Sequence, residues 1–218
     1  MPRRHVIPSD YFPFFISARA NNKEWFALPL EDVYGLYANV LETTIKKYQI
    51  QCQGFILMSN HFHMLVSTPK ANLSQAMRYF MTESSRGIAK ASKRINRIYG
   101  SRYHWTLIRE SQHYAHAYLY VYRNPVKAKI VEKVEAYRFH TLHPWHRKFK
   151  SLILSDSHGF DEHIPKIREE QLDWLNQEED EAYSDHVRRA LRKTEFSFSQ
   201  NRSNGRRPTY FDKVHPQK

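Results

Sequence analysis

Apolar residues occur in short runs, separated by polar turn-forming residues, in the first half of the chain. Residues 10–28 combine an aromatic and β-branched run with an Asn-Asn dipeptide, which predicts two strands joined by a turn. Residues 50–58 and 61–68 flank a Ser-Asn dipeptide, and this predicts a tight hairpin because Ser and Asn accept turn conformations. Residues 102–108 predict one more strand.

Between these runs the apolar residues recur at three- and four-residue steps, the spacing of an amphipathic helix. One helix is predicted over residues 29–48, opened by a proline. A longer helix is predicted from Asn72 to about Ile98, with Ile95 in its buried seam. Asn72 is followed three residues later by Gln75, which predicts an N-cap with a reciprocal side-chain partner.

A further helix contains three alternating tyrosines. Residues two apart on a helix lie about 200° apart around its axis, so Tyr118 and Tyr122 share one face and Tyr120 shares the other with Asn124. We expect the first pair to pack in the core. Asn124 precedes a proline, and Asn followed by Pro also predicts the start of a new helix over residues 126–131.

The predicted elements follow the order strand, helix, strand, strand, helix, strand, helix. This order predicts an α+β fold, a ferredoxin-like split βαβ with a central antiparallel sheet and helices on one face. We expect a domain over residues 1–150, an acidic and partly helical C-terminal extension over 151–196, and a basic flexible tail over 197–218. RNA-recognition domains share this architecture, so the fold alone does not choose a function.

The charge of the chain is unevenly distributed. Residues 156–185 hold 11 of the 22 acidic side chains and only two basic ones, although the formal net charge of the whole chain is +12. The remaining sequence is therefore strongly basic, as expected for a protein that binds a polyanion such as DNA. A single cysteine, Cys52, and the lack of a long apolar run predict a cytoplasmic protein without a membrane segment.

Two histidines stand at alternate positions of the second hairpin strand. Side chains of a strand alternate between its faces, so His61 and His63 point the same way and are close enough to share one divalent metal. Phe62, Met64 and Val66 take the other face, where we expect the core. A His-x-His pair is also compatible with histidines that are simply exposed on a strand.

The sequence resembles a known family at two motifs. Met58-Ser59-Asn60-His61-Phe62-His63 and, later, Tyr120 followed by Asn124-Pro125-Val126 are the marks of the HUH single-tyrosine transposases, in particular the REP-associated tyrosine transposase group. The likeness extends over about residues 1–145.

This resemblance implies metal-dependent cleavage and rejoining of single-stranded DNA with hairpin ends. Tyr120 would be the nucleophile and form a 5′-phosphotyrosine. The metal ion, Mg²⁺ or Mn²⁺, would be held by His61, His63 and Asn124. The sequence departs from the family pattern at Lys129, where many relatives have Gly. The residues expected to contact DNA are basic ones, namely Arg3, Arg4, Arg86, Lys90, Lys93, Arg97, Arg123 and Lys127.

Three classes of function remain open on the sequence. The first is the DNA strand-transfer enzyme, and the second is a non-catalytic DNA or RNA hairpin binder on the same scaffold. The third is an RNA-binding module, in which Phe55 could stack on a base. The sequence leaves a monomer and a homodimer equally open.

Overall fold

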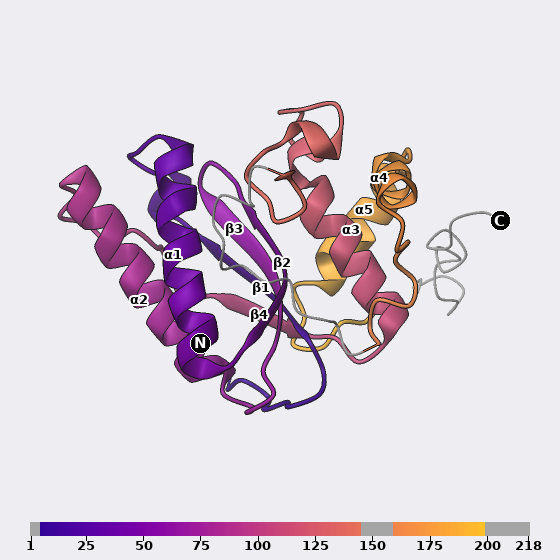
Figure 1. Cartoon of the computed structure of the whole chain (residues 1–218), viewed down its shortest axis with the longest axis horizontal. Coiled ribbons are helices and arrows are strands. Elements are labelled where there is room, and N and C mark those ends of the chain that lie inside the picture. The colour runs from indigo at the N-terminus through magenta and orange to yellow at the C-terminus, as the bar shows by residue number, and fades with distance from the viewer. Residues whose placement is uncertain (1–4, 145–158, 199–218) are drawn as a thin grey trace.

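The computed structural model of the chain describes residues 5–144 and 159–198 (Figure 1). Its sheet has four antiparallel strands in the order β2-β3-β1-β4. The strands are β1 (Phe14–Arg19), β2 (Gln51–Leu57), β3 (His61–Ser67) and β4 (His104–Leu107). The described α-helices are α1 (Leu30–Tyr48), α2 (Leu73–Ser92), α3 (Ser111–Lys127), α4 (Arg168–Asn176) and α5 (Glu181–Ala190), and short 3₁₀ helices span Asn21–Lys23 and Val134–Ala136.

The order of the elements confirms the predicted α+β fold with an antiparallel sheet. One predicted strand was wrong, because residues 10–28 contain β1 alone. After β1 the chain enters a 3₁₀ turn in which Asn22 has a left-handed φ of 53°. The following segment then bonds to the hairpin tip, with Phe26 N–H donating to the Ser59 carbonyl, so it does not return along β1.

The helices cover both faces of the sheet, and the prediction that they lie on one face was wrong (Figure 1). Phe14 and Ile16 of β1 belong to a core that α1 and α2 close, whereas Phe15 between them belongs to a second core closed by α3. Both cores need apolar residues from the same strands, which explains why β2 and β3 are apolar at consecutive positions. Phe55 is fully buried in the first core, so it is not available to stack on a base.

Helix α2 ends earlier than predicted. Lys93 takes a left-handed conformation (φ 55°), and its N–H bonds to the Ala89 carbonyl, which closes the helix after Ser92. Ile95 consequently leaves the helical seam and is 100% exposed. The Asn72 side chain makes no cap bond and donates to the Tyr48 carbonyl at 2.8 Å, which ties the start of α2 to the end of α1.

Helix α3 continues through Asn124 and Pro125, so the separate helix predicted over residues 126–131 was wrong. A proline lacks an N–H and normally interrupts a helix, but Pro125 stands in the last turn, where little of the helix remains. Asn124 Nδ2 donates to the Tyr120 carbonyl at 3.0 Å and fixes the amide beside the tyrosine. The helix closes with Ile130 N–H on the Pro125 carbonyl and Lys129 N–H on the Val126 carbonyl, the bond pattern of a Schellman motif.

The described part of the acidic extension packs on α3. Trp174, Leu175, Tyr183 and Val187 are buried in the second core together with the apolar side of α3. The segment after α5 also runs beside β4, where Leu107 N–H donates to the Thr194 carbonyl at 2.9 Å. The extension therefore completes the second core.

Several predicted features fall outside the described residues. These are Arg3 and Arg4, the proposed domain boundary at residues 150 and 151, and residues 199–218 of the predicted tail. Among the helices that are described, none has both the length and the apolar character needed to cross a membrane.

Lys129 follows the end of α3 in a left-handed conformation (φ 56°). The cost of this conformation to the stability of the protein can be tested by substitution. A residue with a Cβ destabilises this conformation by about 1 kcal/mol, which glycine avoids. We expect Lys129→Gly to raise the free energy of unfolding by about 1 kcal/mol in urea titrations. Lys129→Ala, which removes the same charge but keeps a Cβ, is the control and should give no such gain; an equal gain in both variants would assign the effect to charge.

Candidate active site

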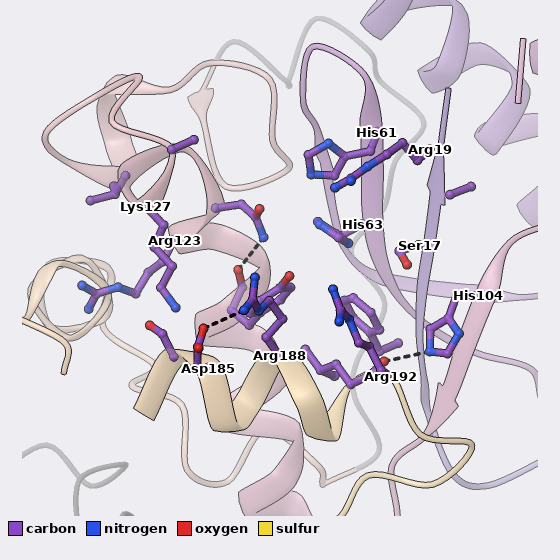
Figure 2. A pocket seen from close by; sticks show the side chains of 18 of the residues that line it. Ser17, Arg19, His61, His63, His104, Arg123, Lys127, Asp185, Arg188 and Arg192 are labelled. Carbon is purple, nitrogen blue, oxygen red and sulfur yellow. Dashed lines mark hydrogen bonds and ion pairs between the residues drawn. The ribbon is translucent and has the colours of Figure 1, made fainter. Parts of the chain in front are cut away.

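A cleft of about 1030 Å³ opens between the end of the sheet and α5 (Figure 2). Tyr120 is one of the residues that line it. We call it the Tyr120 cleft. β1 and β3 supply one side, the second half of α3 another, and α5 with the residue pair after it the third. The cleft is lined by the four residues that were predicted to form one site, namely His61, His63, Tyr120 and Asn124.

The two histidines share one face of β3, as predicted, and their ring centroids are 4.9 Å apart. The residues between and after them, Phe62, Met64 and Val66, are buried in the core on the other face. His63 is 6% exposed and stacks on Phe15 at a centroid distance of 5.3 Å. This packing fixes the His63 ring.

Asn60 orients the first histidine. Asn60 Nδ2 donates to the Lys23 carbonyl at 2.7 Å, which turns its Oδ1 toward His61. His61 Nδ1 lies 2.8 Å from that oxygen and donates to it. The Nε2 atom of His61 then keeps its lone pair for another partner, the arrangement in which a second residue sets the tautomer of a metal-binding histidine.

Both imidazoles are held neutral. Burial lowers the pKa of His61 to about 4, assisted by the charge of Arg19, while a hydrogen bond with Asn124 acts in the opposite direction. Burial also lowers the pKa of His63 well below its usual range, with further contributions from His61 and Arg19. Neutral imidazole is the form that binds a metal ion.

The three tyrosines of α3 divide as the helical geometry predicted. Tyr122 is fully buried, its hydroxyl lies 2.7 Å from Thr141 Oγ1, and a Cβ placed on Gly54 would come within 2.9 Å of that hydroxyl. Tyr118 stacks on Trp174 with centroids 6.2 Å apart. Tyr120 faces the other way.

The Tyr120 ring packs edge-on against the second histidine. Its centroid is 5.5 Å from that of His63 and 5.9 Å from that of Phe15. Burial raises the pKa of the Tyr120 phenol, whereas a hydrogen bond with Asn124 and the charges of Arg188, Arg192 and Arg19 lower it. The site therefore surrounds the buried phenol with groups that favour its ionised form.

The residues fit a divalent cation. Neither ring nitrogen of the buried His63 has a hydrogen-bond partner among the described residues, which would be costly for a side chain with no ligand. His61 Nε2 and the side chain of Asn124 complete a set of nitrogen and oxygen donors suited to Mn²⁺ or Mg²⁺. The described residues contain no group of three or more His, Cys, Asp or Glu side chains that could hold a metal.

The predicted DNA contacts lie in different places. Arg123 is only 8% exposed, and its Nε lies 3.3 Å from Glu179 Oε2, while Lys127 Nζ lies 2.8 Å from the same oxygen. These two residues reach the cleft but are already paired with the acidic extension. The remaining predicted contacts lie on or just after α2, across the sheet from Tyr120, and none lines the cleft; they are Arg86, Lys90, Lys93 and Arg97.

The structure also brings four arginines to the cleft that the sequence analysis did not single out, and one of them is Arg102, which lies just before β4. Arg19 ends β1 opposite His61, while Arg188 belongs to α5 and Arg192 follows it (Figure 2). The four-residue spacing of Arg188 and Arg192 places them on one side of a helix, and this was the available signal. It was hidden by the acidic character of the segment before them.

Comparisons with known proteins show what the chain is similar to in sequence and in fold. The family model described as "Transposase IS200 like" matches residues 23–108. A Haemophilus influenzae protein named "Putative REP-associated tyrosine transposase" is 25% identical over 168 residues, which cover 72% of this chain and 92% of that protein. A solved structure of a REP-associated tyrosine transposase bound to a REP hairpin shares the fold, with a TM-score of 0.55, 21% identity, and coverage of 72% of this chain and 89% of that one. The chain is therefore similar in sequence and in fold to the REP-associated tyrosine transposases, and the resemblance predicted from its motifs is confirmed.

Proposed function

We propose that the chain cleaves and rejoins single-stranded DNA with hairpin ends in a metal-dependent reaction, with Tyr120 as the nucleophile. The proposal is carried by the surroundings of His63. Its buried ring nitrogens have no hydrogen-bond partner among the described residues, and its ring packs edge-on against that of Tyr120. A structural histidine would be expected to hydrogen-bond. A ligand that binds His63 would lie next to the phenol.

The chemistry assigned to Tyr120 is attack on a backbone phosphorus. A bond forms between Tyr120 Oη and phosphorus, and the bond from phosphorus to the 3′ oxygen breaks, which leaves a 5′-phosphotyrosine and a 3′-hydroxyl. The phenolic proton leaves to solvent and the 3′ oxygen takes one up. A divalent cation on His61, His63 and Asn124 would supply Lewis-acid stabilisation of the phosphate charge.

Asn124 has a positioning part in this scheme. Its Nδ2 is held by the Tyr120 carbonyl, so the carbonyl oxygen of the amide remains free to accept or to bind a metal. The same amide lies close enough to His61 and to the Tyr120 hydroxyl to influence the pKa of both, so it connects the histidine strand with the nucleophile. The rigid helix and strand behind these three residues favour a fixed geometry.

The DNA substrate is inferred from charge and from the related structure. The cleft is predominantly basic, as a site for a phosphate backbone requires. The solved relative with the same fold is bound to a REP hairpin, and a hairpin substrate for this chain is part of the proposal. A cytoplasmic location and the choice between monomer and homodimer stay predictions.

The nucleophile can be tested by removing single hydroxyl groups. We expect Tyr120→Phe to bind hairpin-tailed single-stranded DNA normally but to form no covalent adduct with Mn²⁺ present. Labelled DNA that stays with the protein on a denaturing gel measures the adduct.

Tyr122→Phe is the matched control, because it removes the hydroxyl of a tyrosine on the opposite face of α3. It loses the Thr141 contact, at a cost of about 1–3 kcal/mol if that partner is stranded, and should still cleave. An adduct that persists in Tyr120→Phe and disappears in Tyr122→Phe would contradict the proposal, because the nucleophile would then be Tyr122 on the opposite face of α3. Specific DNA binding without any wild-type adduct would favour the non-catalytic hairpin binder.

The metal site can be tested through its pH dependence. If both imidazoles had the ordinary pKa of about 6.5, lowering the pH from 8 to 6 would weaken Mn²⁺ binding roughly 15-fold. Because burial lowers the pKa of His61 to about 4 and that of His63 also well below normal, both rings stay neutral at pH 6. We expect the Mn²⁺ affinity measured by calorimetry to change less than about twofold over this range.

His61→Ala is the control for this measurement. It should abolish Mn²⁺ binding and adduct formation while changing hairpin affinity little, because phosphate contacts dominate the affinity of proteins for DNA. Undiminished Mn²⁺ binding in this variant, or the full loss of affinity at pH 6 in the wild type, would argue against the histidine site.

A further inference from the structure

The basic side chains of the Tyr120 cleft differ in whether they are already neutralised. Arg123 and Lys127 share the carboxylate of Glu179 at the edge of the cleft. Arg19 and Arg192, by contrast, form no ion pair within residues 5–144 and 159–198. Two unpaired cations of the cleft therefore lie at the end of β1 and just after α5, and Arg102 and Lys129 also line the cleft without an ion pair in the described part of the chain.

Arg188 is the third member of this group. Its guanidinium lies 2.9 Å from Asp185 Oδ1, one turn earlier on α5, and about half of its side chain is exposed (49%). An exposed pair of this kind contributes little stability, so the guanidinium can exchange its carboxylate for another anion at low cost. Figure 2 shows Arg188 and Arg192 rising from the α5 side and Arg19 beside His61 on the strand side.

The α5 arginines are held by a well-anchored backbone. Thr106 Oγ1 of β4 lies 2.8 Å from the Leu191 carbonyl oxygen and 2.8 Å from the Lys193 carbonyl oxygen, on either side of Arg192, and its single hydroxyl hydrogen can be donated to either. Val187 and Leu191 are buried in the second core. The position of Arg192 is thus fixed by the edge strand of the sheet, although the residue lies in the C-terminal extension.

We propose that Arg19, Arg188 and Arg192 bind the backbone phosphates of the DNA strand at Tyr120, so that the C-terminal extension supplies part of the active site. The inference rests on the proposed function. Guanidinium groups match phosphate oxygens in geometry and remain charged at any working pH. Placed on two sides of the nucleophile, they would orient the scissile phosphate and offset the charge that develops as Tyr120 attacks.

A binding experiment without metal tests the contacts independently of cleavage. In a Tyr120→Phe background, the affinity for a hairpin-tailed single strand is measured by fluorescence anisotropy over a range of salt concentrations. Loss of one phosphate contact to a single strand lowers the slope of log affinity against log salt by about 0.7. We expect this decrease for Arg19→Gln, Arg188→Gln and Arg192→Gln.

Arg189→Gln is the matched control. Arg189 neighbours Arg188 on α5 but does not line the cleft. Its substitution by Gln removes the same charge as the other variants do. Its slope should equal that of the parent protein, and Arg192→Lys should restore the slope lost in Arg192→Gln. The proposal would be overturned if Arg192→Gln had the same salt slope as the parent protein. It would also be overturned if Arg192→Gln and Arg189→Gln lowered the salt slope equally.

A second experiment with Mn²⁺ separates binding from the reaction. At saturating DNA, Arg192→Gln should slow single-turnover adduct formation by about 100-fold, the usual effect of removing one group that stabilises a transition state. Arg192→Lys should recover part of the rate and Arg189→Gln should keep all of it. If the wild type forms no adduct, the proposed function fails, and the salt slopes alone decide whether these arginines bind the strand.

Discussion

The fold and the candidate active site both depend on β3 being covered on both of its faces. Phe62, Met64 and Val66 fill the core beneath α1 and α2, while His63 and Leu65 face α3. Because strand side chains alternate strictly, a shift of one residue in the pairing of β3 would turn both histidines toward α1 and α2 and turn Phe62 toward α3. The register that stabilises the first core is therefore the same register that places both imidazoles in the cleft, and the site cannot be lost without disrupting the core.

Helix α3 supplies Tyr120 and Asn124 to the site, and here too the packing of one face fixes what the other face presents. Tyr118 and Tyr122 anchor the helix in the second core, and Tyr122 packs so closely on Gly54 that a larger residue there would collide with it. With that face fixed, the helical rotation leaves Tyr120 and Asn124 facing β3. Pro125 does not break this geometry because it stands in the last turn of the helix, which ends at Lys127. Packing on one side of α3 thus determines chemistry on the other.

The sequence predicted those parts of the site that depend on local periodicity. The shared face of His61 and His63 follows from the two-residue period of a strand, and the separation of Tyr120 from Tyr122 follows from the helical period. It mispredicted the end of α2, where Lys93 turns left-handed although the apolar period continues to Ile95, which is consequently exposed. Helices on both faces of the sheet were signalled by consecutive apolar residues in β2 and β3, which a sheet exposed on one side does not need.

The acidic extension shows why net charge by segment can mislead. Residues 156–185 suggest a region that would repel DNA, yet in this chain Glu179 neutralises Arg123 and Lys127. Arg188 of α5 and Arg192 just after it line the Tyr120 cleft. A carboxylate shared by two cations lowers the cost of burying Arg123, which helps to seat the extension on α3. Seating the extension in turn fixes the two later arginines near the nucleophile. The acidic residues therefore help to build a basic site, because the function of each charge depends on which side chain it faces and not on its neighbours in sequence.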